Sequence, residues 1–388
     1  MSDLTSTLQA SDALLTQPGL DHEVVMPFTK GQDGHCSVHE KATRAEVVRR
    51  LAQLKHCLSS EELPQHLWPA RPYLVPAETI VGVAYARTLG LQDEDGLFGG
   101  VVPHAFVATK AITHPLVSAS ASAPAGWSNA FPQQVAGVVL PGFSAFSRSD
   151  AETAGARLLA QGPLRVKLVA ETGGRGQVVV RSLDELQVCL ADITDDVLAT
   201  HGVVLEHNLS KVDTLSVGQV RLGGTVASYF GHQYLTKNNK GTEAYGGSAL
   251  TVVPGDFQTL VDMLPPGPLR TGVEQALVYD SAARSCFPGL FASRINYDVA
   301  QGTNAAGEWC SGVLEQSWRM GGATGAEITA LEALQTDPKL TQVHTRCVEE
   351  FGPLRPVPAG AVVYFQGEDP EVGLLTKYAM VETHGHTA

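Results

Sequence analysis

Two acidic residues, each close to an arginine in the sequence, are the first candidates for a metal-binding site. The stretches SRINYDVA and GVLEQSWR each contain one acid, Asp298 and Glu315, and one arginine, Arg294 and Arg319. Both stretches have the composition of strands, and the short turn QGTNAAGEW between them could bring the strands side by side. Two carboxylates in one cleft suit Mg²⁺, a hard cation that also takes phosphate oxygens. The alternative is a pair of surface acids in salt bridges with the arginines, and the residues alone favour neither.

A glycine-rich segment forms the second candidate site. The stretch VKLVAETGGRGQVVV, residues 166–180, places the glycines between two apolar runs. It matches neither G-x-x-x-x-G-K-[ST] nor G-x-G-x-x-G, which removes the main support for those two nucleotide folds. A tight hairpin turn is the simplest interpretation, because glycine supplies positive φ. Lys167 before the turn and Arg175 within it favour an additional role in binding an anion.

Hydrophobic periodicity and turn residues predict the elements around these candidates. We expect helices over 43–58, after Pro76, and over 149–160, 182–190, 323–335 and 341–351. We expect strands over 97–106, 135–140, 203–206, 215–222, 225–230, 290–300 and 309–316, and on both sides of the glycines. Residues 1–34 read as irregular apart from the apolar piece 24–28. The second half is therefore predicted to be strand-rich and antiparallel.

Size and charge limit the class of function. A chain of 388 residues is long for one core, so two or three packed units are expected. The net charge of −13 argues against a sequence-independent nucleic-acid binder, which needs a basic face. No apolar run has the roughly 18 residues that cross a bilayer, and the first residues lack the pattern of a secretion signal. We therefore expect a soluble, cytoplasmic protein with small-molecule ligands and no membrane partner.

Three further features give weaker predictions. The six cysteines contain no C-x-x-C pair, which favours reduced thiols. His35 and His39 are four residues apart, but without a third ligand a surface or capping role is favoured over a metal site. The stretch YLTKNNKGTEAYGGSAL, residues 234–250, is either a long hairpin loop or a segment that contacts the substrate.

Taken in order, these residues resemble the ATP-grasp superfamily, which includes D-alanine:D-alanine ligase and glutathione synthetase. The resemblance rests on an early lysine, V-K-x-x-x-x-x-G-G-x-G, V-V-L-E, R-x-x-x-D and E-x-x-x-R, and covers about Thr109–Leu334. Over its length the chain also resembles a bacterial group in this superfamily without an assigned activity, as in FVATKAITHPL, YGGSAL and GVLEQSWRMGG. The resemblance implies an α/β (α+β) fold that holds the nucleotide between two α+β subdomains. Four parts are expected: an irregular N-terminus (1–34), a small N-terminal α/β domain (35–108), a central subdomain with a glycine-rich lid (109–202), and a C-terminal subdomain with the metal site (203–388).

The resemblance also implies roles for nucleotide-binding residues. Lys110 would reach the ATP phosphates, and Lys167 would lie near the α-phosphate and the adenine. Glu206 would lie at the hinge that holds the adenine, and Asp213 or Thr214 would hold the ribose. The remaining nucleotide-binding positions would be Leu209 beside the hinge and the lid residues Gly173, Gly174, Arg175 and Gly176.

At the reacting end, the resemblance makes Asp298 and Glu315 the metal carboxylates. Arg294 and Arg319 would join Lys110 as catalytic residues that steady the transferring phosphoryl group. The family usually has asparagine as the third metal ligand, where this chain has Ser317. A hydroxyl is a weaker ligand than an amide oxygen, so the second metal is less secure, unless Gln316 or water contributes.

The activity implied is a ligase that uses ATP and Mg²⁺. A substrate carboxylate would become an acyl phosphate and then react with an amine or a similar nucleophile. Two alternatives stay open: a phosphotransferase on the same fold, and an ATP-binding regulator without turnover, which Ser317 would favour. The substrate cannot be read from the sequence, and a homodimer would be ordinary for such a protein.

Overall fold

The computed structural model describes residues 24–30, 36–60, 72–169 and 176–386. The α-helices are α2 (Val38–Leu54), α3 (Val83–Thr88), α4 (Ala130–Val135), α5 (Arg148–Leu159), α6 (Leu183–Ala191), α7 (Asp195–His201), α8 (Phe257–Met263), α9 (Pro268–Cys286) and α10 (Thr324–Thr336). The 3-10 turns are Glu94–Gly96, Ala105–Ala108 and Lys110–Thr113. The first nine strands are β1 (Val24–Phe28), β2 (Leu58–Ser59), β3 (Pro72–Pro76), β4 (Ile80–Val81), β5 (Gly100–Val102), β6 (Gly142–Ala145), β7 (Leu164–Leu168), β8 (Gln177–Val180) and β9 (Val203–His207). The others are β10 (Ser210–Leu222), β11 (Thr225–Lys237), β12 (Glu243–Pro254), β13 (Phe291–Ala292), β14 (Arg294–Thr303), β15 (Trp309–Ser317), β16 (Leu340–Phe351), β17 (Val362–Asp369) and β18 (Gly373–His386).

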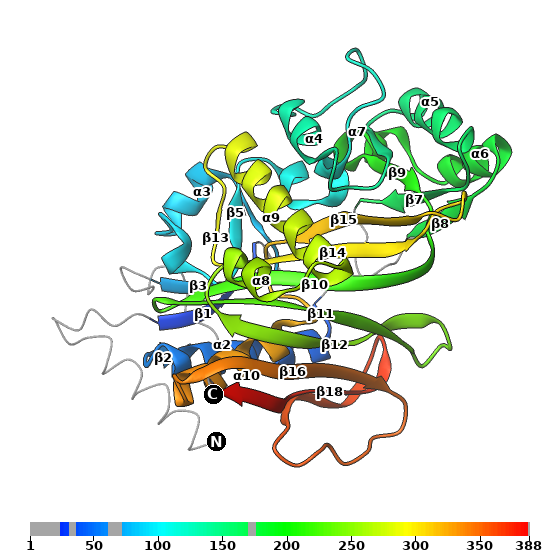
Figure 1. Ribbon diagram of the computed structural model, residues 1–388. Coiled ribbons are helices and arrows are strands. Elements are labelled where there is room, and N and C mark those ends of the chain that lie inside the picture. The colour runs from blue at the N-terminus through cyan, green and yellow to red at the C-terminus, as the bar shows by residue number, and fades with distance from the viewer. Residues whose placement is uncertain (1–23, 31–35, 61–71, 170–175, 387–388) are drawn as a thin grey trace.

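An eight-stranded antiparallel sheet forms the centre of the molecule, in the order β15-β14-β10-β11-β12-β16-β18-β17. Helices α8 and α9 cover one face of it (Figure 1), where Val217, Tyr297 and Val273 share a core. Helix α10 packs on the opposite face, with Tyr229 and Leu331 in a second core. Because side chains alternate along a strand, Arg294, Asn296 and Asp298 share the face of α10.

A smaller front unit is packed onto this sheet. Its three-stranded sheet has the order β2-β1-β3, and both pairings are parallel. Helix α2 begins at a capping box, in which Ser37 accepts from the backbone N–H of Glu40 and the Glu40 side chain accepts in return. The apolar face of α2 belongs to the same core as α10 and β16. The front unit and the large sheet therefore share one hydrophobic core.

A second antiparallel sheet, in the order β6-β9-β7-β8, forms a separate unit with α5 and α6. Strands β7 and β8 pair with Lys167 opposite Gln177, which confirms the predicted hairpin on either side of the glycines. Residues 170–175, including Gly173, Gly174 and Arg175, lie outside the described residues. Helix α6 is capped by Ser182, whose side chain accepts from the backbone N–H of Glu185, as predicted. Helix α5 is capped by Ser147 with Asp150, two residues before the predicted pair.

Three predicted elements are wrong. Residues 341–351 form strand β16 instead of a helix, because β12 and β18 pair with it on both sides. The predicted strand 135–140 begins as the end of α4 and continues as a turn. Of the predicted strand 97–106, only Gly100–Val102 is a strand, and a 3-10 turn follows.

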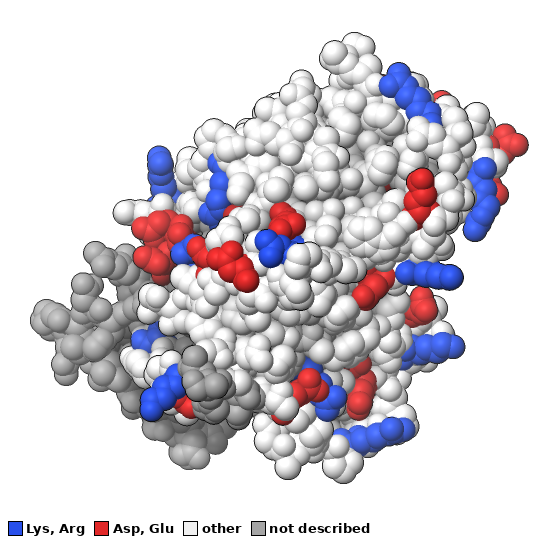
Figure 2. All heavy atoms as spheres, in the orientation of Figure 1, with Lys and Arg blue, Asp and Glu red and all other residues white. Residues whose placement is uncertain are grey.

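On the face drawn in Figure 2, the described lysines and arginines are scattered among acidic and uncharged residues and form no continuous basic patch. None of the helices in the described ranges is long and apolar enough to cross a membrane.

Candidate functional site

Asp298 and Glu315 lie opposite each other on neighbouring strands, as the sequence predicted. They form a cross-strand pair between β14 and β15. A bulge follows at once, since Val299 pairs with Val313 and leaves Leu314 as the extra residue on β15. The bulge matters because Glu315 turns to the same face as Asp298 while Val313 keeps its place in the apolar core. Two carboxylates thus face one another at one end of the sheet.

The surroundings of Asp298 make its carboxylate hard to ionise. Burial and the neighbouring Glu315 charge raise the pKa of Asp298 to about 6. Two amides partly offset this, since Asn296 Nδ2 and Gln233 Nε2 both donate to Asp298 Oδ1, at 2.9 Å and 2.7 Å. A cation between the two acids would remove their repulsion. Among the described residues no group of three or more His, Cys, Asp or Glu could hold a metal.

Lys110 faces the same carboxylate pair from a different part of the chain. Its side chain is 4% exposed, and Nζ lies 3.1 Å from Glu315 Oε2. The segment that carries it is fastened to β15 by Gln316, whose Nε2 donates to the carbonyls of Val107 and Thr109 at 2.8 Å each. Tyr279 donates to Gln316 Oε1 from the other side. Gln316 therefore positions the Lys110 segment, and both of its amide hydrogens are used away from the carboxylates.

A second buried cluster joins Lys167, Glu206 and His114. Lys167 Nζ lies 2.5 Å from Glu206 Oε1, and His114 Nε2 lies 3.1 Å from Glu206 Oε2. All three side chains are buried. Burial opposes ionisation of Glu206, but the Lys167 charge and the bonds from His114 and Lys167 outweigh it and lower the pKa of Glu206 to about 2. Glu206 is thus a carboxylate that accepts from two partners, and its side chain points away from solvent.

The five residues Lys110–His114 connect the two clusters. Lys110 contacts Glu315 in the eight-stranded sheet, and His114 contacts Glu206 in the four-stranded sheet. Ser144 of β6 donates to the carbonyl of Ala111 at 2.6 Å, which ties the same segment to the smaller sheet. The segment Lys110–His114 therefore joins two clusters, which together contain two buried lysines and three carboxylates, where the two sheets meet.

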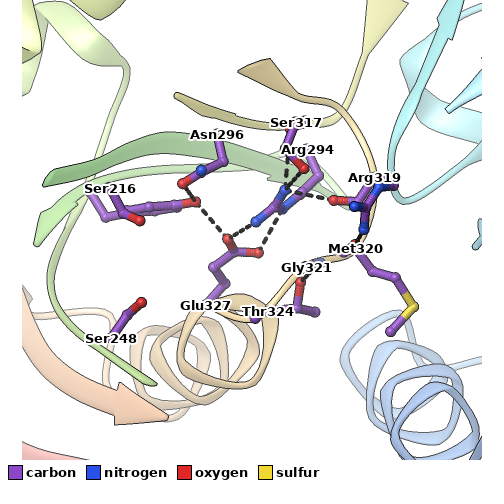
Figure 3. A network of polar contacts seen from close by, with 12 residues as sticks. Ser216, Ser248, Arg294, Asn296, Ser317, Arg319, Met320, Gly321, Thr324 and Glu327 are labelled. Carbon is purple, nitrogen blue, oxygen red and sulfur yellow. Dashed lines mark hydrogen bonds and ion pairs between the residues drawn. The ribbon is translucent and has the colours of Figure 1, made fainter. Parts of the chain in front are cut away.

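Arg294 is fully engaged within the protein (Figure 3). Its guanidinium is 1% exposed and donates to both oxygens of Glu327 on α10, at 3.0 Å and 2.6 Å. Its Nη1 donates to Arg319 O at 2.6 Å, to Ser317 O at 3.2 Å and to Ser317 Oγ at 3.3 Å. This buried pair raises the pKa of Arg294 against the opposing effect of desolvation. Arg294 thus holds the backbone that follows β15.

Arg319 is the more accessible of the two predicted arginines. Its side chain is 28% exposed, and Nε lies 3.3 Å from Glu78 Oε2, on the loop after β3 of the front unit. Its Nη1 donates to the carbonyl of Met320 at 2.9 Å. Because Glu78 is largely exposed, this pair is open to competition from a ligand.

The other predicted residues have different surroundings. Leu209 is buried with Leu140 and Ala300, beside the connection between the two sheets. Asp213 is half-exposed and pairs with His232 at 2.9 Å. Gly176 is the first described residue after the glycine stretch and has φ of 63°, which glycine adopts without strain.

Sequence reasoning missed several members of the site, in particular His114, Glu327, Tyr229 and Asn296. His114 and Glu327 find their partners 92 and 33 residues away, which no local pattern shows. One signal was readable: Asn296 stands two residues before Asp298 on a predicted strand, so both had to share one face.

Comparison with solved structures identifies the fold. The biotin carboxylase domain of 2-oxoglutarate carboxylase from Hydrogenobacter thermophilus, a complex with MgADP, ADP and bicarbonate, matches with a TM-score of 0.55, 12% identity, 93% of this chain and 86% of that chain. Biotin carboxylase from Campylobacter jejuni, an ATP complex, matches with a TM-score of 0.51, 10% identity, 93% of this chain and 87% of that chain. At such identities the likeness concerns the fold alone. The fold is the ATP-grasp fold, as the sequence predicted.

Sequence comparison places the chain in a family. A search of curated proteins gives no match. The model of one family, described as protein of unknown function (DUF3182), matches residues 28–379, which include every described residue of the site. The chain therefore belongs to the DUF3182 family.

Proposed function

We propose that this protein is an ATP-dependent ligase that activates a substrate carboxylate for attack by an amine or a similar nucleophile. The γ-phosphoryl group of ATP would pass to a carboxylate oxygen, giving an acyl phosphate and ADP. The nucleophile would then displace phosphate and form an amide-type bond. The observation that supports this most directly is the junction of the two sheets, where Lys110–His114 brings the Lys167–Glu206 pair next to the Asp298–Glu315 pair.

The charges at this junction suit a bound triphosphate. Lys110 and Lys167 are each held by one carboxylate, and their ammonium groups could turn to phosphate oxygens with little movement of the backbone. Glu206 would keep the Lys167 side chain oriented in the absence of ATP. Arg319, whose partner Glu78 is exposed, is the arginine that could meet the acyl phosphate or the carboxylate. Arg294 would act through the backbone it holds.

The carboxylates of Asp298 and Glu315 repel each other, and such a pair suits Mg²⁺, the cation that accompanies ATP in these reactions. Asp298 and Glu315 would hold it, and it would neutralise charge on the transferring phosphoryl group. The lid role of Gly173, Gly174, Arg175 and Gly176, the adenine role of Glu206 and Leu209, and the ribose role of Asp213 stay predictions.

ADP release tests this proposal. The full chain is incubated with ATP and Mg²⁺ against pools of carboxylates, each with and without pools of amines. The ligase predicts ADP release that needs a carboxylate and rises with an amine, and Glu315→Gln should lower it by about 100-fold or more. ADP release unchanged by every amine would favour the phosphotransferase. Calorimetric ATP binding without ADP release in any pool would favour the regulator.

A further inference from the structure

The hydroxyl of Tyr229 faces two acceptors with a single hydrogen. It lies 2.5 Å from Glu327 Oε1 and 3.0 Å from Asn296 Oδ1. Glu327 accepts two bonds from Arg294 and is an acceptor here as well. The short, charge-assisted contact to Glu327 takes the phenol hydrogen. Asn296 Oδ1 is then left next to an oxygen with no hydrogen between them.

Burial makes this unsatisfied oxygen costly. Asn296 is 7% exposed, so bulk water does not replace the missing donor. Gln233 is the other amide at Asp298, and it differs from Asn296 in burial and in the number of acceptors that its amide nitrogen contacts. Its Nε2 donates to Ser216 Oγ at 2.8 Å as well as to Asp298, and the residue is only partly buried.

Turning the Asn296 amide over would give the Tyr229 oxygen a donor, but it would bring Asn296 Oδ1 towards Asp298 Oδ1. Nδ2 would then donate to the Tyr229 oxygen, and Tyr229 would still donate to Glu327. Oδ1 would turn towards Asp298 Oδ1, which now receives Nδ2 at 2.9 Å. Two oxygens that face each other in a buried place repel, and a cation between them would remove the repulsion.

Ser317, the residue first considered for this role, is poorly placed for it. Its Oγ already accepts from Arg294 Nη1 at 3.3 Å, so a metal ion there would lie beside a buried guanidinium (Figure 3). Asn296 is the residue directly opposite Ser317 on β14, and it lies on the same face as Asp298.

We propose that Asn296, instead of Ser317, supplies the amide oxygen to the cation held by Asp298 and Glu315, and that its amide turns over when the cation binds. This inference rests on the proposed function in one respect, namely that the cation is the one that accompanies ATP. The amide oxygen that position 317 does not provide would thereby come from the neighbouring strand, β14.

Binding of Mn²⁺ to the full chain with ADP, followed by electron paramagnetic resonance, tests this inference without turnover. Asn296→Ala should weaken Mn²⁺ binding by about tenfold or more, and the matched Ser317→Ala should change it by less than about twofold. ADP affinity in EDTA should stay within about twofold of wild type for both, which shows that the variants are folded. Asn296→Asp, which adds a charge and keeps the size, should tighten Mn²⁺ binding, and a misfolded variant could not do so.

The opposite pattern would overturn the inference: a loss of Mn²⁺ affinity in Ser317→Ala with no loss in Asn296→Ala. Weaker Mn²⁺ binding by Asn296→Asp would also contradict it. Failure of the wild-type chain to bind ADP or ATP at all would instead contradict the proposed function, so the two failures are distinct.

Discussion

At the scale of single residues, Asp298 should cost the metal-free protein stability at neutral pH. Its pKa of about 6 lies above the ordinary 3.8. A raised pKa gives stability that is fully present below pH 3.8 and is lost as the pH rises through 6. In EDTA, Asp298→Asn should therefore raise the free energy of unfolding at pH 7.5 by about 2 kcal/mol or less, because the carboxylate is partly exposed. Urea denaturation at pH 4 is the control, where the gain should vanish; an equal gain at both pH values would contradict the assignment.

Lys167 gives the opposite prediction for stability. Lys167→Met leaves the buried Glu206 carboxylate with His114 alone, and should lower the free energy of unfolding at pH 7 by about 3–5 kcal/mol. The pKa of Glu206 is depressed to about 2, so the stability from this pair is present above pH 4.5 and is lost as the pH falls through 2. Urea denaturation should show that adding Glu206→Gln to Lys167→Met restores much of the loss. No recovery in the double variant would mean that the pair is not coupled.

At the scale of elements, Gln316 on β15 should affect nucleotide binding through the segment it holds. Gln316→Leu removes the side-chain donor to the carbonyls of Val107 and Thr109 and so releases the Lys110 turn from β15. ADP affinity, measured by calorimetry, should fall by about tenfold. Gln301→Leu on β14 is the matched control, because Gln301 is equally buried and donates to the carbonyl of Pro268 at 2.7 Å. An equal loss of ADP affinity in both variants would show a general effect of destabilisation.

Helices and strands could be predicted from the sequence where the local residue pattern favours the same conformation as the tertiary contacts. Strands β14 and β15 have the composition of strands and are joined by a short turn, so their pairing followed from the sequence. Strand β16 was misjudged because Val343, Cys347 and Phe351 recur every four residues, as on a helix, although pairing with two strands decides its conformation. Helix α9 was not predicted, despite Pro268 at its first turn. The carboxylate pair was found by its motif, whereas Glu327 and His114 depend on packing between distant segments.

At the scale of the whole molecule, the front unit and the large sheet should fold as one body. Arg50 on α2 is 2% exposed and donates to Glu332 on α10 at 2.7 Å and to the Tyr364 hydroxyl of β17 at 2.6 Å. This contact and the shared core both connect residues on the two sides of position 108. The domain boundary at residue 108 stays a prediction.

A fragment of residues 109–388 should therefore fail to fold, because one face of α10 would lose its cover. Circular dichroism on heating should show no cooperative transition, while the full chain melts cooperatively. Arg50→Met in the full chain should lower the free energy of unfolding by about 1.5–3 kcal/mol, since the half-buried Glu332 loses its partner. A fragment that melts cooperatively would show that the front unit is an independent domain.

The turn Lys110–Thr113 with His114 has a consequence for how the molecule responds to ligands. Lys110 contacts one sheet and His114 contacts the other, four residues apart along a single 3-10 turn. A ligand that draws the Lys110 ammonium from Glu315 changes the restraint that His114 exerts on Glu206. If binding of a ligand shifts the two sheets relative to each other, the coupling is reciprocal. The relative position of the sheets must then change the affinity for that ligand by the same free energy. Cross-linking the sheets in one position would then tighten or weaken nucleotide binding, according to which position is trapped.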